Sequence, residues 1–315
     1  MGRLTLSEGN TLASSRLTEL PTTLSGLLRH PINRGRKLAA LQRYLKWQVS
    51  SRLAPGPMAV ELVAGARVLV RPGMPGAEAA VCFGLYEFEE MAFVLHALLP
   101  GDLFVDCGAS SGTYAVLAAG GAGAHCLAFE PLEPAASELT ANIGLNGLQE
   151  KISQRRAGLG AKAGRLRMTT SEGERNHVTR DHEPGAEGTL WVPVESLDDH
   201  LENETRPFIV KLSVEGFELP VLRGGRKALA RPNALAVIAR VDEACEGYGI
   251  AGEEFDEEIR TLGFEPVAYQ PFRRRLVDQY ELDPHVRHTL YVKNRPVVAG
   301  RVAAAPLRRV LGTDL

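Results

Sequence analysis

Short apolar runs and amphipathic segments alternate along the central part of the chain. Runs typical of buried strands lie near residues 103–106, 125–130, 152–157, 208–214, 235–241, 264–269 and 289–293. Segments with apolar positions at helical spacing predict helices over 84–99, 134–146 and 253–262. This alternation is typical of a mostly parallel sheet with helices on both faces. The sequence therefore predicts an α/β fold on a seven-stranded sheet.

The first part of the chain has a different pattern. Residues 1–30 show no clear periodicity, residues 34–52 predict a helix, and residues 59–63 and 67–71 predict a hairpin. We accordingly expect an N-terminal helical and hairpin extension over 1–83, a main domain over 84–295 and a C-terminal tail over 296–315.

The helix over 34–52 combines a stripe of apolar residues with many cations. Leu38, Leu41, Leu45 and Val49 recur at helical spacing, and the residues between them include Lys and Arg but no acid. One interpretation is that the apolar stripe packs on the main domain. The other is that the helix grips an acidic glycan, a phosphate or a membrane surface.

Composition and charge limit the partners and the cellular location that we expect for this protein. The chain has 315 residues, a mass of 34.1 kDa and a formal net charge of -2, which argues against a bulk electrostatic partnership with nucleic acid. Its four cysteines have no paired spacing, so we expect reduced core residues. We find no signal peptide and no run of apolar residues long enough to span a membrane, and we expect a cytoplasmic protein.

A glycine turn between two predicted strands is the strongest sign of a ligand site. The first strand ends in Asp106, Gly108 and Gly112 follow, and the next strand ends in Glu130. Glycines let the backbone approach a ligand closely, and the second acid can accept hydrogen bonds from two ribose hydroxyls. NAD, FAD and S-adenosylmethionine sites all use such a turn. The spacing from Gly108 to Gly112 differs from the Gly-x-Gly-x-x-Gly pattern, so a nicotinamide-dependent oxidoreductase ranks lowest.

With later segments included, the chain resembles the FkbM family of S-adenosylmethionine-dependent methyltransferases. The stretches that carry the resemblance are 104–114 (FVDCGASSGTY), 128–131 (AFEP), Asn142 with 145–146 (LN), 196–198 (SLD), 210–218 (VKLSVEGFE) and 221–224 (VLRG). They occur in the expected order, and the resemblance covers about residues 84–269. It implies a Rossmann-like class I methyltransferase fold with S-adenosyl-L-methionine as cofactor.

The resemblance also implies which residues bind the cofactor. Asp106 is expected near the methionine part, and Glu130 is expected to hold the ribose. Glu87 would lie near the glycine turn if its helix packs beside it, although a favourable charge at the helix N-terminus would equally explain this acid. The expected cofactor-binding residues are Asp106, Gly108, Ala109, Ser110, Gly112, Tyr114, Glu130 and Glu87.

The activity implied by the resemblance is in-line transfer of a methyl group to a hydroxyl of a sugar, glycan or secondary metabolite. The residues expected to assist are His177, Glu215 and Ser213, with Glu218 as a further acid that could take the proton. Lys211 is expected to be half buried in its strand and paired with an acid. We find no metal-ligand spacing among the histidines and expect no metal. The expected partner is a small-molecule or glycan acceptor. The sequence leaves open whether the chain forms a homo-oligomer.

Three positions depart from the family pattern. The family usually has Asn at the position of Ser110, Asp at that of Ser213 and an acid at that of Arg240. Serine cannot act as a base at neutral pH without help, and Arg240 reverses a charge at the same edge of the sheet. The departures leave a second hypothesis, a catalytically impaired methyltransferase-like protein with a binding or regulatory role.

Overall fold

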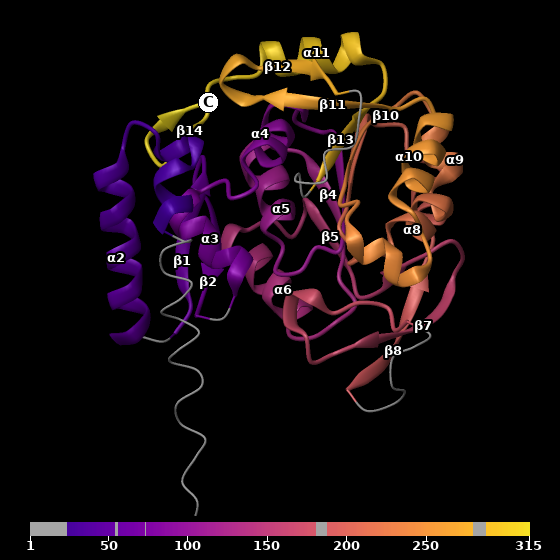
Figure 1. Cartoon of the computed structure of the whole chain (residues 1–315), viewed down its shortest axis with the longest axis horizontal. Coiled ribbons are helices and arrows are strands. Elements are labelled where there is room, and N and C mark those ends of the chain that lie inside the picture. Colours follow the sequence, from indigo (N-terminus) through magenta and orange to yellow (C-terminus); the bar gives the residue numbers. More distant parts are fainter. Residues whose placement is uncertain (1–23, 54–55, 73, 181–187, 280–287) are drawn as a thin grey trace, which may run out of the picture.

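A central sheet of eight strands organises the computed structural model, which describes residues 24–53, 56–72, 74–180, 188–279 and 288–315 (Figure 1). In spatial order the strands are β12 (Arg275–Asp278), β11 (Glu265–Gln270), β13 (Thr289–Val292), β10 (Ala234–Ala239), β9 (Phe208–Leu212), β3 (Leu103–Cys107), β4 (His125–Phe129) and β5 (Ile152–Arg155). The five strands from β10 to β5 are parallel, whereas β13 and β12 pair antiparallel with their neighbours.

All seven predicted strands lie in this sheet, but the sheet is mixed and has an eighth strand. The additional strand, β12, begins at Arg275, between the strands predicted over 264–269 and 289–293. It forms because buried Leu276 pairs with buried Tyr269 across a short turn after β11. The prediction of seven strands is therefore corrected to eight, with an antiparallel edge.

Helices cover both faces of the sheet, as predicted. One face carries α4 (Phe88–Ala97), α5 (Thr113–Val116), which continues as a π-helix over Leu117–Ala122, α6 (Ala135–Asn146) and α11 (Arg295–Ala304). The other face carries α7 (Leu197–Leu201), α8 (Glu218–Gly224), α9 (Arg226–Ala230) and α10 (Gly252–Thr261). Side chains alternate along β3, so Phe104 joins the first core and Val105 the second.

The N-terminal extension packs onto the first of these cores. It contains α2 (Lys37–Leu53), the predicted hairpin of β1 (Met58–Val63) and β2 (Ala66–Val70), and α3 (Pro75–Phe83). The hairpin is fixed to α6, because Asn142 Oδ1 accepts the Leu69 N–H at 2.7 Å. The predicted helix over 84–99 is shorter than expected, because Gly84, with φ 67°, ends α3 and α4 begins only at Phe88.

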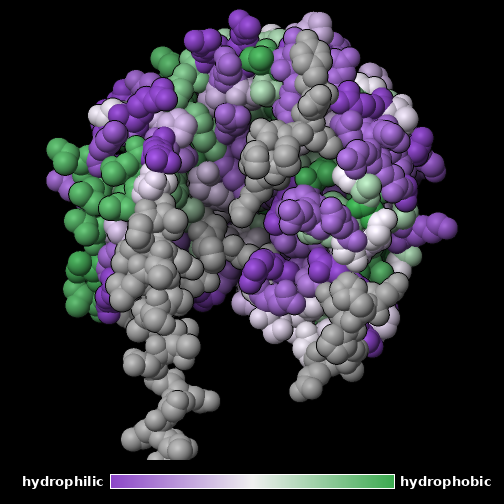
Figure 2. Space-filling view, viewed as in Figure 1, coloured by the Kyte–Doolittle hydropathy of each residue, from purple (hydrophilic) through white to green (hydrophobic). Residues whose placement is uncertain are grey.

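The helix α2 is oriented opposite to the first interpretation of its sequence. Its buried residues are Ala40, Tyr44 and Trp47. The predicted core stripe faces outward, with Leu38 78% and Leu45 54% exposed. Aromatic side chains bury more apolar area than leucine does, and Tyr44 and Trp47 therefore decide which face packs. The exposed stripe contributes to the hydrophobic patch at the left of Figure 2.

Two smaller elements complete the fold. The segment 158–195 contains a three-stranded sheet in the order β6 (Gly158–Leu159), β8 (Thr189–Glu195), β7 (Gly164–Thr169). The C-terminal segment ends in a hairpin of β14 (Arg309–Val310) and β15 (Thr313–Asp314), and Thr313 Oγ1 donates a hydrogen bond to the Ile32 carbonyl at 2.9 Å. Among the described helices, none is long and apolar enough to cross a bilayer.

Candidate functional site

The turn after β3 lies where the sheet order reverses, between β3 and β9. Ligands of open α/β sheets bind at this place, beyond the carboxyl ends of the strands. Gly108 has φ 82°, and a Cβ added there would lie 2.0 Å from the Ser213 carbonyl oxygen. Only glycine therefore lets the turn approach the end of β9 so closely.

The rest of the turn is fixed to β4 and α6. The N–H groups of Gly108 and Ala109 both donate to the Phe129 carbonyl, at 3.2 and 2.9 Å. Gly112 has φ 85°, and a Cβ there would lie 2.3 Å from the Leu139 side chain of α6. Gly108, Ala109 and Gly112 thus shape the turn. The backbone N–H of Ser110 contacts Glu130.

Glu130 is held with both carboxylate oxygens in defined positions. Its Oε2 accepts the Ser110 N–H at 2.9 Å, and its Oε1 accepts the Leu132 N–H at 3.0 Å. Burial raises the pKa of Glu130 to about 7, although the two N–H donors act to lower it. Each oxygen keeps a further lone pair. The carboxyl group is therefore suited to two neighbouring hydroxyls, such as those of a ribose.

A cavity of about 220 Å³ opens beside Glu130. It extends from the glycine turn to the end of β9 and to the three-stranded sheet of β6, β7 and β8. Its lining includes Gly108, Ser110 and Glu130 together with Ser213 and Glu215. Most of the remaining wall is apolar. It includes residues of the segment after β4, such as Pro131, Leu132 and Ala135, and residues in or near β7 and β8, such as Leu166, Met168, Val178, Val192, Val194 and Phe217. An apolar cavity with a few convergent polar groups is typical of a small-molecule site.

A second group of predicted residues forms a buried polar cluster outside this lining. Asp106 and Lys211 are paired positions of β3 and β9, and Lys211 Nζ lies 3.7 Å from Asp106 Oδ1. The predicted pairing of Lys211 with an acid is confirmed, although this lysine is fully rather than half buried. The Tyr114 hydroxyl donates to Glu87 at 2.6 Å, and its ring lies 4.9 Å from Lys211 Nζ. The cluster therefore joins β3, β9, α5 and the start of α4.

Asp106 is the most unusual member of this cluster. Within the described part of the chain, neither of its carboxylate oxygens has a hydrogen-bond partner, and the residue is fully buried. Burial raises the pKa of Asp106, and Lys211 opposes this shift. Lys211 supplies the opposite charge at 3.7 Å, and a ligand that reached this carboxyl group could supply the missing hydrogen bonds.

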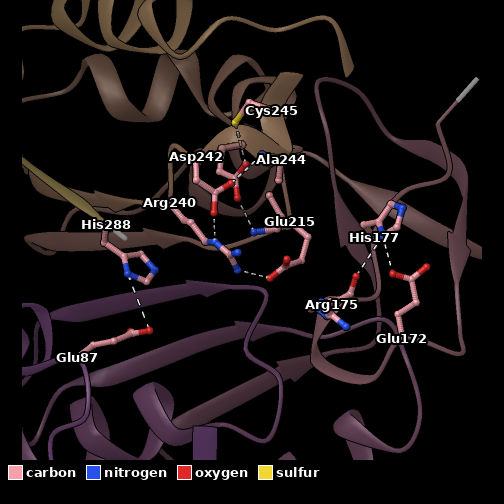
Figure 3. A network of polar contacts seen from close by, with 12 residues as sticks. Glu87, Glu172, Arg175, His177, Glu215, Arg240, Asp242, Ala244, Cys245 and His288 are labelled. Carbon is pink, nitrogen blue, oxygen red and sulfur yellow. Dashed lines mark hydrogen bonds and ion pairs between the residues drawn. The ribbon is translucent and has the colours of Figure 1, made fainter. Parts of the chain in front are cut away.

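The ends of β9 and β10 form an ion-pair network beside Ser213. Arg240 Nη1 lies 2.5 Å from Glu215 Oε1, and Arg240 Nε lies 2.6 Å from Asp242 Oδ2 (Figure 3). Glu215 has φ 52°, a conformation that non-glycine residues rarely adopt. Arg240 therefore anchors the carboxylate of a residue with an unusual backbone conformation at the wall of the cavity.

The structure separates His177 from this network. Its imidazole is directed toward Glu172 and Arg175, with Nδ1 3.1 Å from the Arg175 carbonyl (Figure 3). Among the described residues, its neighbours Asn176 and Val178 line the cavity, whereas the buried His177 does not. Of the three residues expected to assist catalysis, the cavity thus brings together only Ser213 and Glu215.

Glu218 also lies outside the described lining of the cavity. It is fully buried at the start of α8, and its Oε1 accepts the Val214 N–H at 2.8 Å. Burial raises its pKa to about 7. The contacts give Glu218 a part in fixing the turn that carries Glu215.

Sequence patterns did not identify which residues form the apolar wall, nor did they single out Asn176. Side chains such as Met168 and Val192 look like ordinary core residues, and no periodicity in 158–190 distinguishes a cavity wall from a packed interior. The four cysteines are free and buried, as predicted. In the described ranges, no three His, Cys, Asp or Glu side chains are grouped so that they could hold a metal ion.

Comparisons with solved structures return methyltransferases at low similarity. They include an rRNA methylase from Streptococcus thermophilus (16% identity, TM-score 0.34, covering 64% of this chain and 91% of the other). A SAM-dependent O-methyltransferase from Thermotoga maritima matches at 12% identity and TM-score 0.36, covering 65% of each chain. A SAM-dependent methyltransferase from Agrobacterium tumefaciens matches at 12% identity and TM-score 0.37, covering 75% of this chain and 69% of the other. These values are too low to transfer any property to this chain.

The sequence itself decides the family. A search of curated protein sequences finds no match. The family model of the methyltransferase FkbM domain matches residues 106–280. This range includes the glycine turn, Glu130, the ends of β9 and β10 and the three-stranded sheet of β6, β7 and β8. Because this match covers more than half of the chain, the protein belongs to the FkbM family of methyltransferases and uses S-adenosylmethionine as its cofactor.

Proposed function

We propose that the protein transfers a methyl group from S-adenosylmethionine to a hydroxyl oxygen of a sugar, glycan or secondary metabolite. The observation that supports the proposal is a single cavity whose lining includes Glu130, Ser213 and Glu215. S-adenosylmethionine supplies an electrophilic methyl group, so alignment of the acceptor can provide much of the rate enhancement.

We assign two groups of residues to the two substrates. Glu130 would hold the ribose of the cofactor, with Gly108 and Ser110 beside it. Asp106, whose buried carboxylate has no hydrogen bond among the described residues, would face the cationic methionine part together with Glu87 and Tyr114. Ser213 and Glu215 would then meet the acceptor.

Glu215 is our first choice for the group that accepts the proton of the hydroxyl. Its carboxylate lines the cavity, and Arg240 holds it at 2.5 Å. Ser213 would orient the hydroxyl by hydrogen bonding. His177 is the second choice, because its imidazole is bonded to the Arg175 carbonyl and a change of rotamer would be needed before it could reach the cavity.

A small acceptor fits the described surface better than a nucleic acid does. The cavity wall is mostly apolar, and the chain has a net charge of -2, whereas binding to nucleic acid depends largely on cations that contact phosphates. The buried, unpaired cysteines agree with a reducing, cytoplasmic location.

The proposal can be tested by methyl transfer from isotopically labelled S-adenosylmethionine. A panel of sugars, glycans and hydroxylated metabolites would be compared with transfer RNA and ribosomal RNA. We expect label on a hydroxyl compound and none on RNA. In Glu215→Gln the kcat should fall on the order of 100-fold or more, because the proton acceptor is lost. His177→Gln should change kcat much less, and the exposed Glu243→Gln provides the matched control.

Other outcomes separate the alternatives. A greater loss in His177→Gln than in Glu215→Gln would reverse the assignment of the base. Label on RNA alone would refute the proposed acceptor class. Cofactor binding without turnover on the whole panel would support the impaired, regulatory protein, particularly if Ser213→Asp then restored transfer.

A further inference from the structure

The outer face of α2 exposes a row of large apolar side chains. Leu38, Leu45, Val49 and Leu53 are 78%, 54%, 56% and 81% exposed. They follow one another at intervals of seven, four and four residues, so they lie on one side of the helix. Only eleven large apolar side chains are exposed among the described residues, and four of them are in this row. Such a concentration marks an interaction surface.

Packing of the fold does not account for this row. The opposite side of α2 is the one that packs, through Ala40, Tyr44 and Trp47. Arg43 also faces inward, because its Nη2 donates to Asn33 Oδ1 at 2.7 Å. The helix therefore has one apolar face for the protein interior and a second apolar face that the described chain leaves in solvent.

Cations border the second face. Lys37, Lys46 and Arg52 are exposed on α2, Arg34 and Arg36 are exposed just before it, and residues 34–53 contain no acid. Within the described residues none of these five cations is in an ion pair. The chain as a whole carries a net charge of -2, so this positive charge is local to the helix. An apolar stripe bordered by Lys and Arg is typical of helices that lie in a membrane interface.

The charge also argues against a second copy of the chain. In a symmetric dimer the same patch meets itself, so two basic helices would oppose each other and their cations would repel. An anionic bilayer satisfies both properties of the face at once, because its surface attracts Lys and Arg and its interior accepts leucine side chains. We propose that α2 docks the protein on anionic phospholipid membranes, with its axis in the plane of the bilayer and its packed face toward the protein. This docking is independent of the acceptor proposed above.

Vesicle sedimentation of the full chain tests the docking. We expect binding to vesicles of phosphatidylcholine mixed with phosphatidylglycerol, weaker binding at high salt, and little binding to phosphatidylcholine alone. Leu45→Gln/Val49→Gln should weaken binding on the order of tenfold or more, because two membrane-facing side chains become polar. Lys46→Gln/Arg52→Gln should weaken it by about tenfold or more, in line with the attraction of each cation to the anionic surface.

Matched variants elsewhere on the surface control for general effects. Leu307 is 74% exposed, and Leu307→Gln should bind vesicles like the unchanged chain. The exposed pair Lys162→Gln/Arg165→Gln should also bind unchanged. Thermal unfolding and affinity for S-adenosylmethionine should be the same in all variants, because none of these residues lines the described cavity. These readouts separate loss of docking from loss of the fold and from failure of the proposed activity.

Three results would overturn the docking. The first is no binding of the unchanged chain to anionic vesicles. The second is binding that both α2 variants leave unaffected. The third is a dimer in solution that Leu45→Gln/Val49→Gln dissociates while vesicles are not bound, which would make a second copy the occupant of this face.

Discussion

Lys211 Nζ lies 3.7 Å from Asp106 Oδ1, at paired positions of β9 and β3, and both side chains are buried. Removal of one partner of a buried pair leaves the other charge uncompensated. We expect Lys211→Met to lower the free energy of unfolding by about 3 to 5 kcal/mol in urea denaturation at neutral pH. The exposed Lys162→Met should change it by less than about 0.5 kcal/mol.

The loss of unfolding free energy in Lys211→Met should depend on pH. Burial already raises the pKa of Asp106, and removal of Lys211 raises it further. The folded variant then binds a proton more tightly than the unfolded chain does, so its stability increases as the pH falls. The difference from the unchanged protein should therefore shrink in mildly acidic solution. A difference that stays constant with pH would show that Lys211 acts by packing alone.

Glu130 should make cofactor affinity depend on pH near neutrality. Burial raises its pKa to about 7, and an ionised carboxylate accepts hydrogen bonds from ribose hydroxyls more strongly than a protonated one. By calorimetry we expect the dissociation constant for S-adenosylmethionine to rise by up to about tenfold from about pH 8 to about pH 6, as the ionised fraction falls.

The variant Glu130→Gln isolates this contribution. It should weaken binding by about 1 to 3 kcal/mol at about pH 8 and remove the part of the pH dependence that belongs to Glu130. The exposed Glu150→Gln should reproduce the unchanged protein. Equal affinity in Glu130→Gln and the unchanged chain would mean that another acid holds the ribose.

Two glycines offer opposite outcomes for the same substitution. In Gly108→Ala the new Cβ would lie 2.0 Å from the Ser213 carbonyl oxygen at a φ of 82°, so we expect a loss of about 3 kcal/mol or more in stability. In Gly144→Ala the Cβ meets nothing within 4 Å and φ is helical, so we expect a gain of about 0.5 to 1 kcal/mol. Thermal unfolding of both variants would check this, and a tolerated Gly108→Ala would contradict the close approach.

The fold was largely predictable because its strands are short apolar runs buried on both faces. The seven predicted strands all occur, and helices cover both faces. The edge strand β12 was not predictable from Arg275 and Asp278 at its ends, since an edge strand needs few apolar residues. The first of the two interpretations of α2 was wrong, because apolar spacing alone cannot rank two competing faces and Tyr44 and Trp47 decided between them.

The order of the elements, the glycine turn and the acid Glu130 follow from the sequence, because they depend on local patterns and on residues a few positions apart. Which polar groups share the cavity depends on how distant segments pack. This packing places Glu215 against Arg240 and Asp106 against Lys211, whereas His177 is directed away toward Arg175. The contacts of Arg240 and Lys211 join neighbouring strands that are distant in sequence, and their geometry follows from the register of β3, β9 and β10, which no local pattern specifies. The contact of His177 with Arg175 is local.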